Sequence, residues 1–235
     1  MKDYNVNFRG FNTSIQLALE LAETVAFSLR SGVEKNSFAS LVVSGGSTPV
    51  PFFTALAVHD IRWDKVYITL ADERWVSTGD DDSNELLVRT YLLKGRAAAA
   101  RFVGLMTGTA SPALGEAACG KRIAAIPRPF DAVVLGMGND GHTASLLSGA
   151  KDLPAATDMG SGKFCCAISS VNAKHERLTL TLSTLIDARS IFLHITGRDK
   201  LKVFEKAVGQ GEMSEMPIRH VLAHSAKPVN VYWAP

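Results

Sequence analysis

Apolar residues along this chain follow two patterns, short continuous runs and helical spacing, and the two alternate from the first third of the sequence onward. Short continuous apolar runs, typical of strands buried on both faces, occupy residues 38–43, 65–70 and 130–135. Similar runs occupy residues 164–168, 178–182, 191–195 and 229–233. Helical spacing between them predicts helices over residues 50–58, 84–93, 113–126 and 200–208.

This alternation of strand and helix predicts the fold class. We expect an α/β protein with a mostly parallel, doubly wound, Rossmann-like sheet, helices on both faces and a small additional β-containing segment. Residues 148–163, which are rich in Gly, Ser and Ala, are predicted to form a loop.

The first 40 residues predict an amphipathic opening helix. Residues 12–14 offer N-caps, and Gly32 offers a stop. Between them apolar residues recur at helical spacing, and we expect this stripe to face the core: Ile15, Leu19, Ala22, Ala26 and Leu29.

Composition narrows the class of protein. A length of 235 residues favours one domain over 1–235, and 46% hydrophobic with 20% charged residues is typical of a globular protein. The net charge of +2 comes from scattered residues, which argues against a nucleic-acid partner.

No run approaches the roughly 18 apolar residues of a membrane span, and residues 1–10 lack a signal-peptide core, so we expect a cytoplasmic protein. Three cysteines without a C-x-x-C pattern predict neither a disulfide framework nor a structural metal site.

A glycine loop follows the first predicted strand. In Gly45-Gly46-Ser47-Thr48, small residues let backbone N–H groups approach an anion, and two hydroxyls precede a predicted helix start. This pattern predicts a phosphate-binding loop, with a plain tight turn as the alternative. The loop lacks the Gly-Lys-Ser/Thr ending of nucleoside-triphosphate loops, so Mg-ATP is disfavoured.

Charged residues follow two further predicted strands. Asp72, Glu73 and Arg74 end the second strand, where open α/β sheets bind ligands, and Arg suits bidentate binding of oxyanions. The alternative is a solvated ion pair. A third pair of charged residues, Arg198 and Lys200, follows the predicted strand at residues 191–195. Either could bind a phosphate through its positive charge; the alternative is the start of a surface helix.

The most informative segment is residues 135–147, where a buried strand gives way to a glycine turn that carries Asp140 and His142. The turn also matches the G-x-G-x-x-G dinucleotide pattern, but Asp140 would then place a carboxylate beside the pyrophosphate. We therefore favour an active site over a nicotinamide site. The other five histidines are expected to be satisfied structural residues: His59, His175, His194, His220 and His224.

Taken in order, these motifs resemble those of the 6-phosphogluconolactonase family, within a wider superfamily that includes glucosamine-6-phosphate deaminase. The resemblance rests on Ser44-Gly-Gly-Ser-Thr-Pro49, Asp72-Glu-Arg-Trp-Val76, Ser83-Asn84, residues 136–146, Arg177-Leu-Thr-Leu-Thr181 and Thr196-Gly-Arg-Asp-Lys200. Deaminases carry a Glu five residues after the histidine, whereas this chain has Thr143-Ala-Ser-Leu-Leu147. The lactonase branch is therefore the closer match.

The resemblance implies hydrolysis of 6-phospho-D-glucono-1,5-lactone without a metal or organic cofactor. His142 would act as general base, and Asp140 would orient it or hold sugar hydroxyls. Arg74 or backbone N–H groups of residues 138–141 would stabilise the carbonyl oxygen. The resemblance implies that the substrate is bound by Gly45, Gly46, Ser47, Thr48, Asp72, Arg177 and Lys200.

The expected partner is therefore a small sugar-phosphate lactone, bound by a monomer or small homo-oligomer. Two alternatives stay open, a sugar-phosphate isomerase or deaminase and a non-catalytic sugar-phosphate-binding protein. The isomerase reaction needs a carboxylate near His142 to move protons, and only Asp72 or Glu73 offers one.

Overall fold

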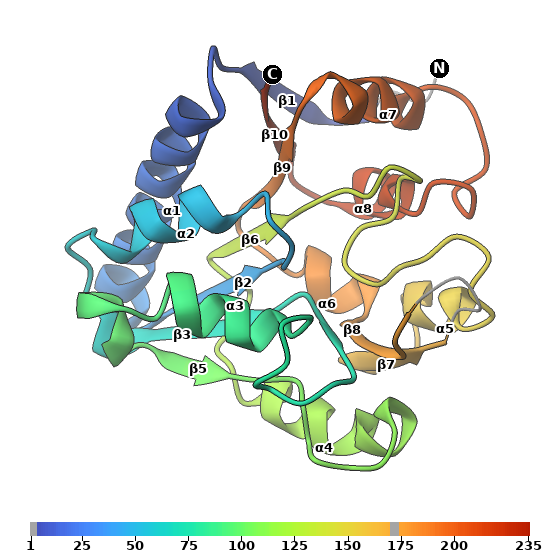
Figure 1. Cartoon of the computed structure of the whole chain (residues 1–235), viewed down its shortest axis with the longest axis horizontal. Coiled ribbons are helices and arrows are strands. Elements are labelled where there is room, and N and C mark those ends of the chain that lie inside the picture. Colours follow the sequence, from blue (N-terminus) through green and yellow to red (C-terminus); the bar gives the residue numbers. More distant parts are fainter. Residues whose placement is uncertain (1–3, 170–173) are drawn as a thin grey trace.

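The computed structural model describes residues 4–169 and 174–235, and a seven-stranded sheet forms its centre (Figure 1). The strand order is β1-β10-β9-β6-β2-β3-β5, and every neighbouring pair is parallel. The strands are β1 (Val6–Gly10), β2 (Ala39–Val43), β3 (Val66–Leu70), β5 (Arg101–Val103), β6 (Ala132–Leu135), β9 (Ile191–Thr196) and β10 (Val229–Ala234). The predicted parallel α/β fold is confirmed.

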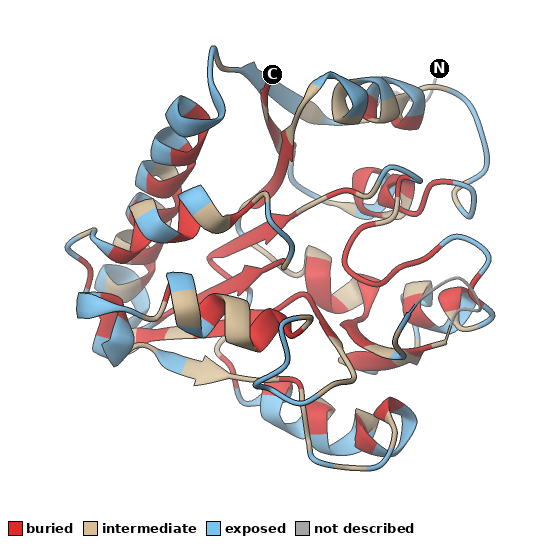
Figure 2. Ribbon diagram, in the orientation of Figure 1, coloured by how far each residue is buried: buried red, intermediate tan, exposed pale blue. Residues whose placement is uncertain are grey.

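Helices flank this sheet on either side, and their buried faces turn toward it (Figure 2). Helix α1 packs against β2 and β10, whereas α7 packs against β9. The helices are α1 (Ser14–Asn36), α2 (Val50–Ala57), α3 (Asn84–Tyr91), α4 (Pro112–Ala124), α5 (Leu153–Thr157), α6 (Leu182–Ile186), α7 (Arg198–Val208) and α8 (Ile218–His224), with 3-10 turns at Trp63–Lys65 and Gly95–Ala99. No helix in the described ranges is long and apolar enough to cross a membrane.

A second, antiparallel sheet supplies the predicted additional β segment. Its strands, in the order β4-β8-β7, are β4 (Asp72–Arg74), β8 (Arg177–Leu180) and β7 (Cys165–Ile168). Only Ala71 separates β3 from β4, so the chain passes directly from the carboxyl end of a central strand into the small sheet. Asp72, Glu73 and Arg74 are therefore held by strand pairing at the edge where ligands bind.

The opening helix forms where predicted, but its buried face and its end differ from the prediction. Ala22, Ala26 and Leu29 are buried as predicted, but Ile15 and Leu19 are 67% and 57% exposed. Gly32 lies inside the helix, which continues to Asn36. Glycine is needed there for space, because a Cβ would overlap the carboxylate of Asp131. Ser37, in the left-handed region at φ 68°, ends the helix instead. The buried face is Leu17, Ala18, Leu21, Ala22, Val25, Ala26, Leu29 and Gly32.

Several short elements escape the sequence pattern. Helix α5 interrupts the predicted loop at residues 148–163, because Leu153 and Ala156 pack into the core. Strands β1 and β5 and helices α6 and α8 were not predicted.

The three cysteines are free thiols, and the sulfur atoms of Cys119 and Cys165 lie 3.0 Å apart.

Candidate active site

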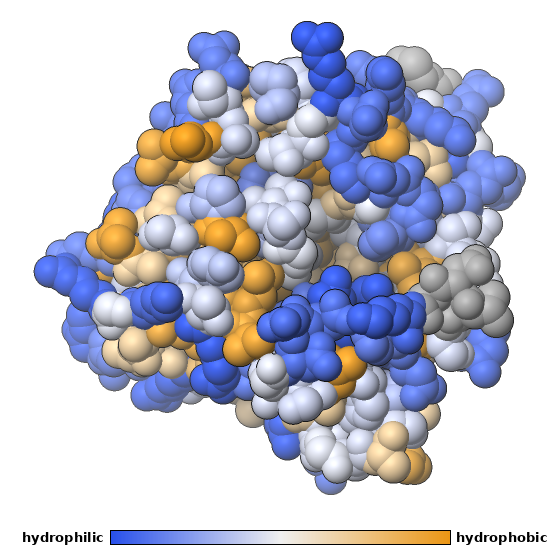
Figure 3. Space-filling view, viewed as in Figure 1, coloured by the Kyte–Doolittle hydropathy of each residue, from blue (hydrophilic) through white to orange (hydrophobic). Residues whose placement is uncertain are grey.

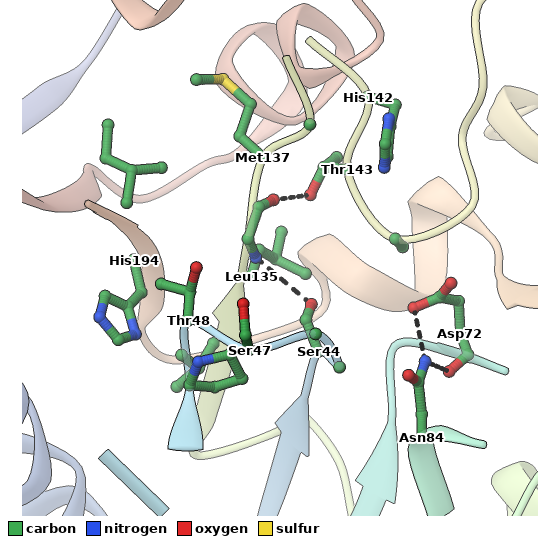
Figure 4. A pocket seen from close by; sticks show the side chains of 18 of the residues that line it. Ser44, Ser47, Thr48, Asp72, Asn84, Leu135, Met137, His142, Thr143 and His194 are labelled. Carbon is green, nitrogen blue, oxygen red and sulfur yellow. Dashed lines mark hydrogen bonds between the residues drawn. The ribbon is translucent and has the colours of Figure 1, made fainter. Parts of the chain in front are cut away.

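A cavity of about 350 Å³ opens at the carboxyl edge of the large sheet, between the ends of β2, β6 and β9 and the small sheet. Figure 3 shows the molecule hollowed near the middle of this face. The loop after β2, the turn after β6 and side chains from both sheets line it (Figure 4). Nine of the predicted site residues line this cavity: Gly45, Gly46, Ser47, Thr48, Asp72, Arg74, His142, Arg177 and Lys200.

The loop after β2 presents free donors to the cavity. Within the described residues, neither the side-chain hydroxyls of Ser47 and Thr48 nor the backbone N–H groups of residues 45–48 donate a hydrogen bond. Gly46 adopts φ +90°, a conformation that glycine tolerates best. Gly45 is required for space, because a Cβ there would overlap the side-chain amide of Asn84. Free N–H and hydroxyl donors at the start of α2 suit an anionic group.

Asp140 holds the imidazole of His142 at the rim of the cavity. The Nδ1 atom of His142 lies 2.6 Å from Oδ1 of Asp140. This hydrogen bond lowers the pKa of Asp140 to about 2, so the carboxylate is ionised at neutral pH. An anion at Nδ1 fixes the proton there and leaves Nε2 as the basic nitrogen. Asp140 is itself absent from the cavity lining and reaches the site through His142.

The glycine turn is built around this imidazole. A Cβ on Gly138 would overlap the His142 ring and come within 2.6 Å of Asp140 Oδ1. Three N–H groups serve the turn itself, since Gly138 donates to His142 O, Gly141 to Gly138 O and His142 to Asp140 Oδ1. These three donors are therefore unavailable to a substrate oxygen, contrary to what was expected of Gly138 and Gly141.

Two guanidinium groups form the wall that the small sheet contributes. Arg74 and Arg177 are direct cross-strand partners in the β4-β8 pair. Arg74 Nη1 donates to the carbonyl of Asp82 at 2.7 Å, and Arg177 Nη1 lies 3.5 Å from Asp72 Oδ2. Like charges placed opposite each other destabilise a strand pair, so this arrangement favours an anionic ligand between them.

Asp72 organises the residues around these arginines. Its Oδ2 accepts a hydrogen bond from Ser145 at 2.6 Å, and its backbone carbonyl accepts one from Asn84 Nδ2 at 2.8 Å. The carboxylate predicted to bind substrate is thus already engaged by Ser145 and Arg177. Sequence reasoning assigned no role to Ser145, and the motif Ser83-Asn84 was the available signal for Asn84.

Glu73 lies behind the cavity, fully buried, and anchors the start of α3. Its carboxylate accepts hydrogen bonds from the backbone N–H groups of Arg74, Asn84 and Glu85 and from the Ser83 hydroxyl, at 2.7–3.1 Å. Burial raises the pKa of Glu73, although the backbone donors act in the opposite direction. The residue is structural rather than part of the cavity.

Lys200 reaches the cavity from the first turn of α7. Its Nζ donates to the carbonyl of Met137 at 2.6 Å, which holds the ammonium beside the glycine turn. Burial lowers the pKa of Lys200, and the charge of Asp140 acts against that shift. Arg198, the alternative cation, does not line the cavity.

Unpartnered polar atoms gather at this cavity. Among the described residues, four buried side-chain nitrogen or oxygen atoms have no hydrogen-bond partner, and all four belong to cavity-lining residues. Such atoms are costly unless a ligand completes their bonding. The prediction that His194 is a satisfied structural residue is wrong, because it is one of the four. The atoms are Arg74 Nε, Asn84 Oδ1, Arg177 Nε and His194 Nδ1.

A metal centre is not formed by the residues in the described ranges, where no three His, Cys, Asp or Glu side chains are placed to share an ion. The residues that line the site offer two imidazoles, two guanidinium groups, an ammonium and backbone donors. An oriented base facing a cationic, donor-rich cavity suits attack on a carbonyl compound that carries an anionic group.

Comparison with known proteins defines the class. The chain belongs to the glucosamine-6-phosphate isomerase/6-phosphogluconolactonase family, whose model matches residues 12–233. A 6-phosphogluconolactonase of Rhizobium meliloti is 41% identical over 98% of this chain and 100% of that protein. Another, from Mesorhizobium japonicum, is 43% identical over 97% of this chain and 95% of that protein.

The solved structures agree with this placement. The crystal structure of a 6-phosphogluconolactonase from Shewanella baltica superposes with a TM-score of 0.95 at 43% identity, and the match covers 98% of both chains. Relatives of this similarity, matched over nearly their full length, belong to the lactonase branch of the family.

Proposed function

We propose that this protein hydrolyses 6-phospho-D-glucono-1,5-lactone to 6-phospho-D-gluconate, the second step of the oxidative pentose phosphate pathway. The observation that carries the proposal is one cavity that joins the His142–Asp140 pair to free anion donors and two arginines. The full-length relatives named 6-phosphogluconolactonase support the same reaction.

His142 acts as the general base. Its Nε2 takes a proton from water as the water oxygen attacks C1, and the resulting imidazolium protonates the departing ring oxygen. Asp140 stabilises the imidazolium and fixes its orientation. No covalent intermediate on the protein is needed, because water is the nucleophile and the ring oxygen is the leaving group.

Arg74 stabilises the negative charge that develops on the carbonyl oxygen. Its guanidinium is held in place by the carbonyl of Asp82, and its Nε has no partner in the described part of the chain. The N–H groups of Gly138, Gly141 and His142 are bonded within the turn, and residues 139 and 140 do not line the cavity, so the role is assigned to Arg74, whose guanidinium does. A fixed donor aimed at developing charge is typically among the largest contributions to catalysis.

The phosphate binds to Gly45, Gly46, Ser47 and Thr48, with Arg177 and Lys200 as cations. Asp72 keeps Arg177 in position and takes part in binding through it. Binding a remote dianion in this way converts its interaction energy into placement of C1 beside His142.

The two carboxylates considered for the deaminase reaction, Asp72 and Glu73, are both occupied by other side chains or backbone groups. Glu73 accepts four hydrogen bonds and lies outside the cavity, and Asp72 is engaged by Ser145 and Arg177. Incubation with glucosamine 6-phosphate is expected to release no ammonia.

The whole chain, residues 1–235, works as one domain on a freely diffusing lactone in the cytoplasm, as a monomer or small homo-oligomer. The pairing of β1 with β10, which joins the two ends of the chain in one sheet, supports a single unit. Nucleic acid and membrane are not among its partners.

The test follows acid release from freshly made 6-phosphogluconolactone, corrected for spontaneous hydrolysis. Wild type is expected to accelerate the reaction, and His142→Ala is expected to lose about 10²–10⁴-fold in kcat with its fold intact by circular dichroism. A wild type without activity would reject the function, and an active His142→Ala variant would reject His142 as the base.

A further inference from the structure

His194 is a buried imidazole in the cavity wall to which the mechanism above gives no role. It lies on β9, two residues before the strand ends at Thr196, and is 4% exposed. Its Nδ1 is buried without a partner, and no described residue hydrogen-bonds to either ring nitrogen. An orphaned buried polar group typically costs about 1–3 kcal/mol, which a bound ligand can recover by completing its bonding.

The ring lies at the phosphate-binding end of the cavity. Phe52 of α2 packs edge-on against it at 6.3 Å between centroids, and α2 begins directly after the loop of residues 44–49. Figure 4 draws His194 on the side of Ser47 and Thr48, across the cavity from His142. The two histidines therefore lie at different ends of one cavity.

His194 is neutral when the enzyme works. Burial lowers its pKa to about 4, so the ring carries one N–H and no charge near pH 7. The charged side chains that share the cavity are Arg74, Arg177, Lys200 and the already engaged Asp72. A phosphate dianion only accepts hydrogen bonds, and a neutral donor adds one without the desolvation cost of burying another cation.

We propose that His194 is a substrate-binding residue, which donates a hydrogen bond from its neutral imidazole to the phosphate group beside Ser47 and Thr48. This inference deepens the proposed function and rests on it for the identity of the sugar. Arg177, Lys200 and the loop supply charge and backbone donors, and His194 supplies a directional contact from the cavity wall.

The binding test uses calorimetric titration with inorganic phosphate and with 6-phosphogluconate. His194→Phe keeps an aromatic ring against Phe52 but removes the donor, and is expected to weaken both ligands by about tenfold to a hundredfold. His194→Gln, which retains an N–H donor, is expected to recover part of that loss. His224→Gln, at an exposed ring on α8, is the matched control and is expected to bind like wild type.

Kinetics separate substrate binding from a merely structural role. His194→Phe is expected to raise KM for the phosphorylated lactone by about tenfold or more while kcat changes by less than about threefold. Hydrolysis of unphosphorylated glucono-1,5-lactone is expected to be unaffected. Equal losses on both lactones, or an unchanged affinity for phosphate, would overturn the proposal.

Nuclear magnetic resonance provides a readout that needs no variant to fold. In long-range ¹H–¹⁵N spectra of the wild type, the His194 ring signals are expected to shift on addition of inorganic phosphate, and unmoved signals at saturating phosphate would refute the contact. A wild type that binds phosphate through His194 yet fails to hydrolyse the lactone would overturn the proposed reaction and leave the phosphate contact standing.

Discussion

The Nδ1 atom of His142 and the Oδ1 atom of Asp140 lie 2.6 Å apart, two residues apart in one glycine turn. The imidazole proposed as base and the carboxylate that holds it thus come from a single local segment rather than from distant parts of the chain. The position of the imidazole therefore depends on the turn itself.

Neutralising the orienting carboxylate is expected to impair the reaction without loss of substrate affinity. Asp140→Asn removes the anion that stabilises the imidazolium, and kcat is expected to fall by up to about 10⁴-fold, the loss that follows replacement of the orienting Asp by Asn in a Ser-His-Asp triad. The measurement is kcat and KM for the lactone. A variant with wild-type kcat would show that Asp140 serves the sugar or the turn only.

Acidification between pH 7 and 5 is not expected to reproduce the Asp140→Asn defect. Because the pKa of Asp140 is about 2, its carboxylate stays ionised throughout this range and continues to hold Nδ1 of His142. The measurement is kcat of wild type and variant at pH 5, 6 and 7, where Asp140→Asn is expected to stay below wild type at each value. Equal rates at the acidic end would show that the Asp140 carboxylate no longer acts there.

A methyl group at residue 138 is expected to displace the base. Gly138→Ala would place a Cβ within the His142 ring, and misplacement by about 1 Å typically costs about 10²-fold in rate. Gly120→Ala is the matched control, because a Cβ there meets nothing within 4 Å. Rates of both variants, measured with thermal unfolding, distinguish a displaced imidazole from a destabilised fold.

The close approach of Gly45 to Asn84 is expected to produce non-additive effects. Gly45→Ala alone forces the loop away from the Asn84 amide, and KM for the lactone is expected to rise about tenfold. In an Asn84→Ala background the added methyl has room, so Gly45→Ala is expected to add less than about threefold. Strict additivity in this double-mutant cycle would refute the steric account.

His194 is expected to make the fold sensitive to acid. Its pKa is about 4 in the folded protein against 6.5 for an ordinary histidine, so below pH 6.5 the unfolded chain binds the proton more tightly and stability falls as pH falls. Between pH 7.5 and 4.5 this amounts to roughly 2–3 kcal/mol at about 1.36 kcal/mol per pKa unit. Urea unfolding at both pH values tests this, because His194→Phe lacks that component and should lose less stability on acidification.

The fold could be predicted where apolar runs are long and continuous. Residues 38–43 and 130–135 correspond to β2 and β6 in the centre of the sheet, where both faces are buried and no alternation is needed. Strand β5, by contrast, has three residues at a sheet edge and little apolar signal. Short edge elements are defined by their partners, which the local sequence does not specify.

Helix α1 illustrates why a periodic pattern can be right in part only. Its predicted apolar stripe is buried at Ala22, Ala26 and Leu29, but in the first turns packing against β2 and β10 buries Leu17 and Leu21 in place of Ile15 and Leu19. Gly32 indicated a stop by its residue type, but its role is to make room for Asp131 from a segment about 100 residues away. Such contacts cannot be read locally.

The candidate site could be predicted to a large extent, because its residues follow strand ends and glycine turns. Partners that depend on tertiary contact could not, among them Ser145 with Asp72, and Asn84 with Gly45. His194 was missed because a histidine within an apolar run is ordinarily structural, and only the burial of its unpartnered nitrogen distinguishes it.

Arg74 and Arg177 both line the cavity because β4 and β8 pair in a register that places them opposite each other. Side chains alternate between the two sides of a ribbon, so sliding β8 by a single position would turn Arg177 away from the ligand while leaving its sequence unchanged. Strand β7 pairs with β8 along its other edge. Substitutions in β7 that shift this pairing can therefore alter the affinity for an anion, although β7 itself does not contact the anion. Under the proposed function, selection for sugar-phosphate binding acts on backbone pairing as well as on the arginines themselves.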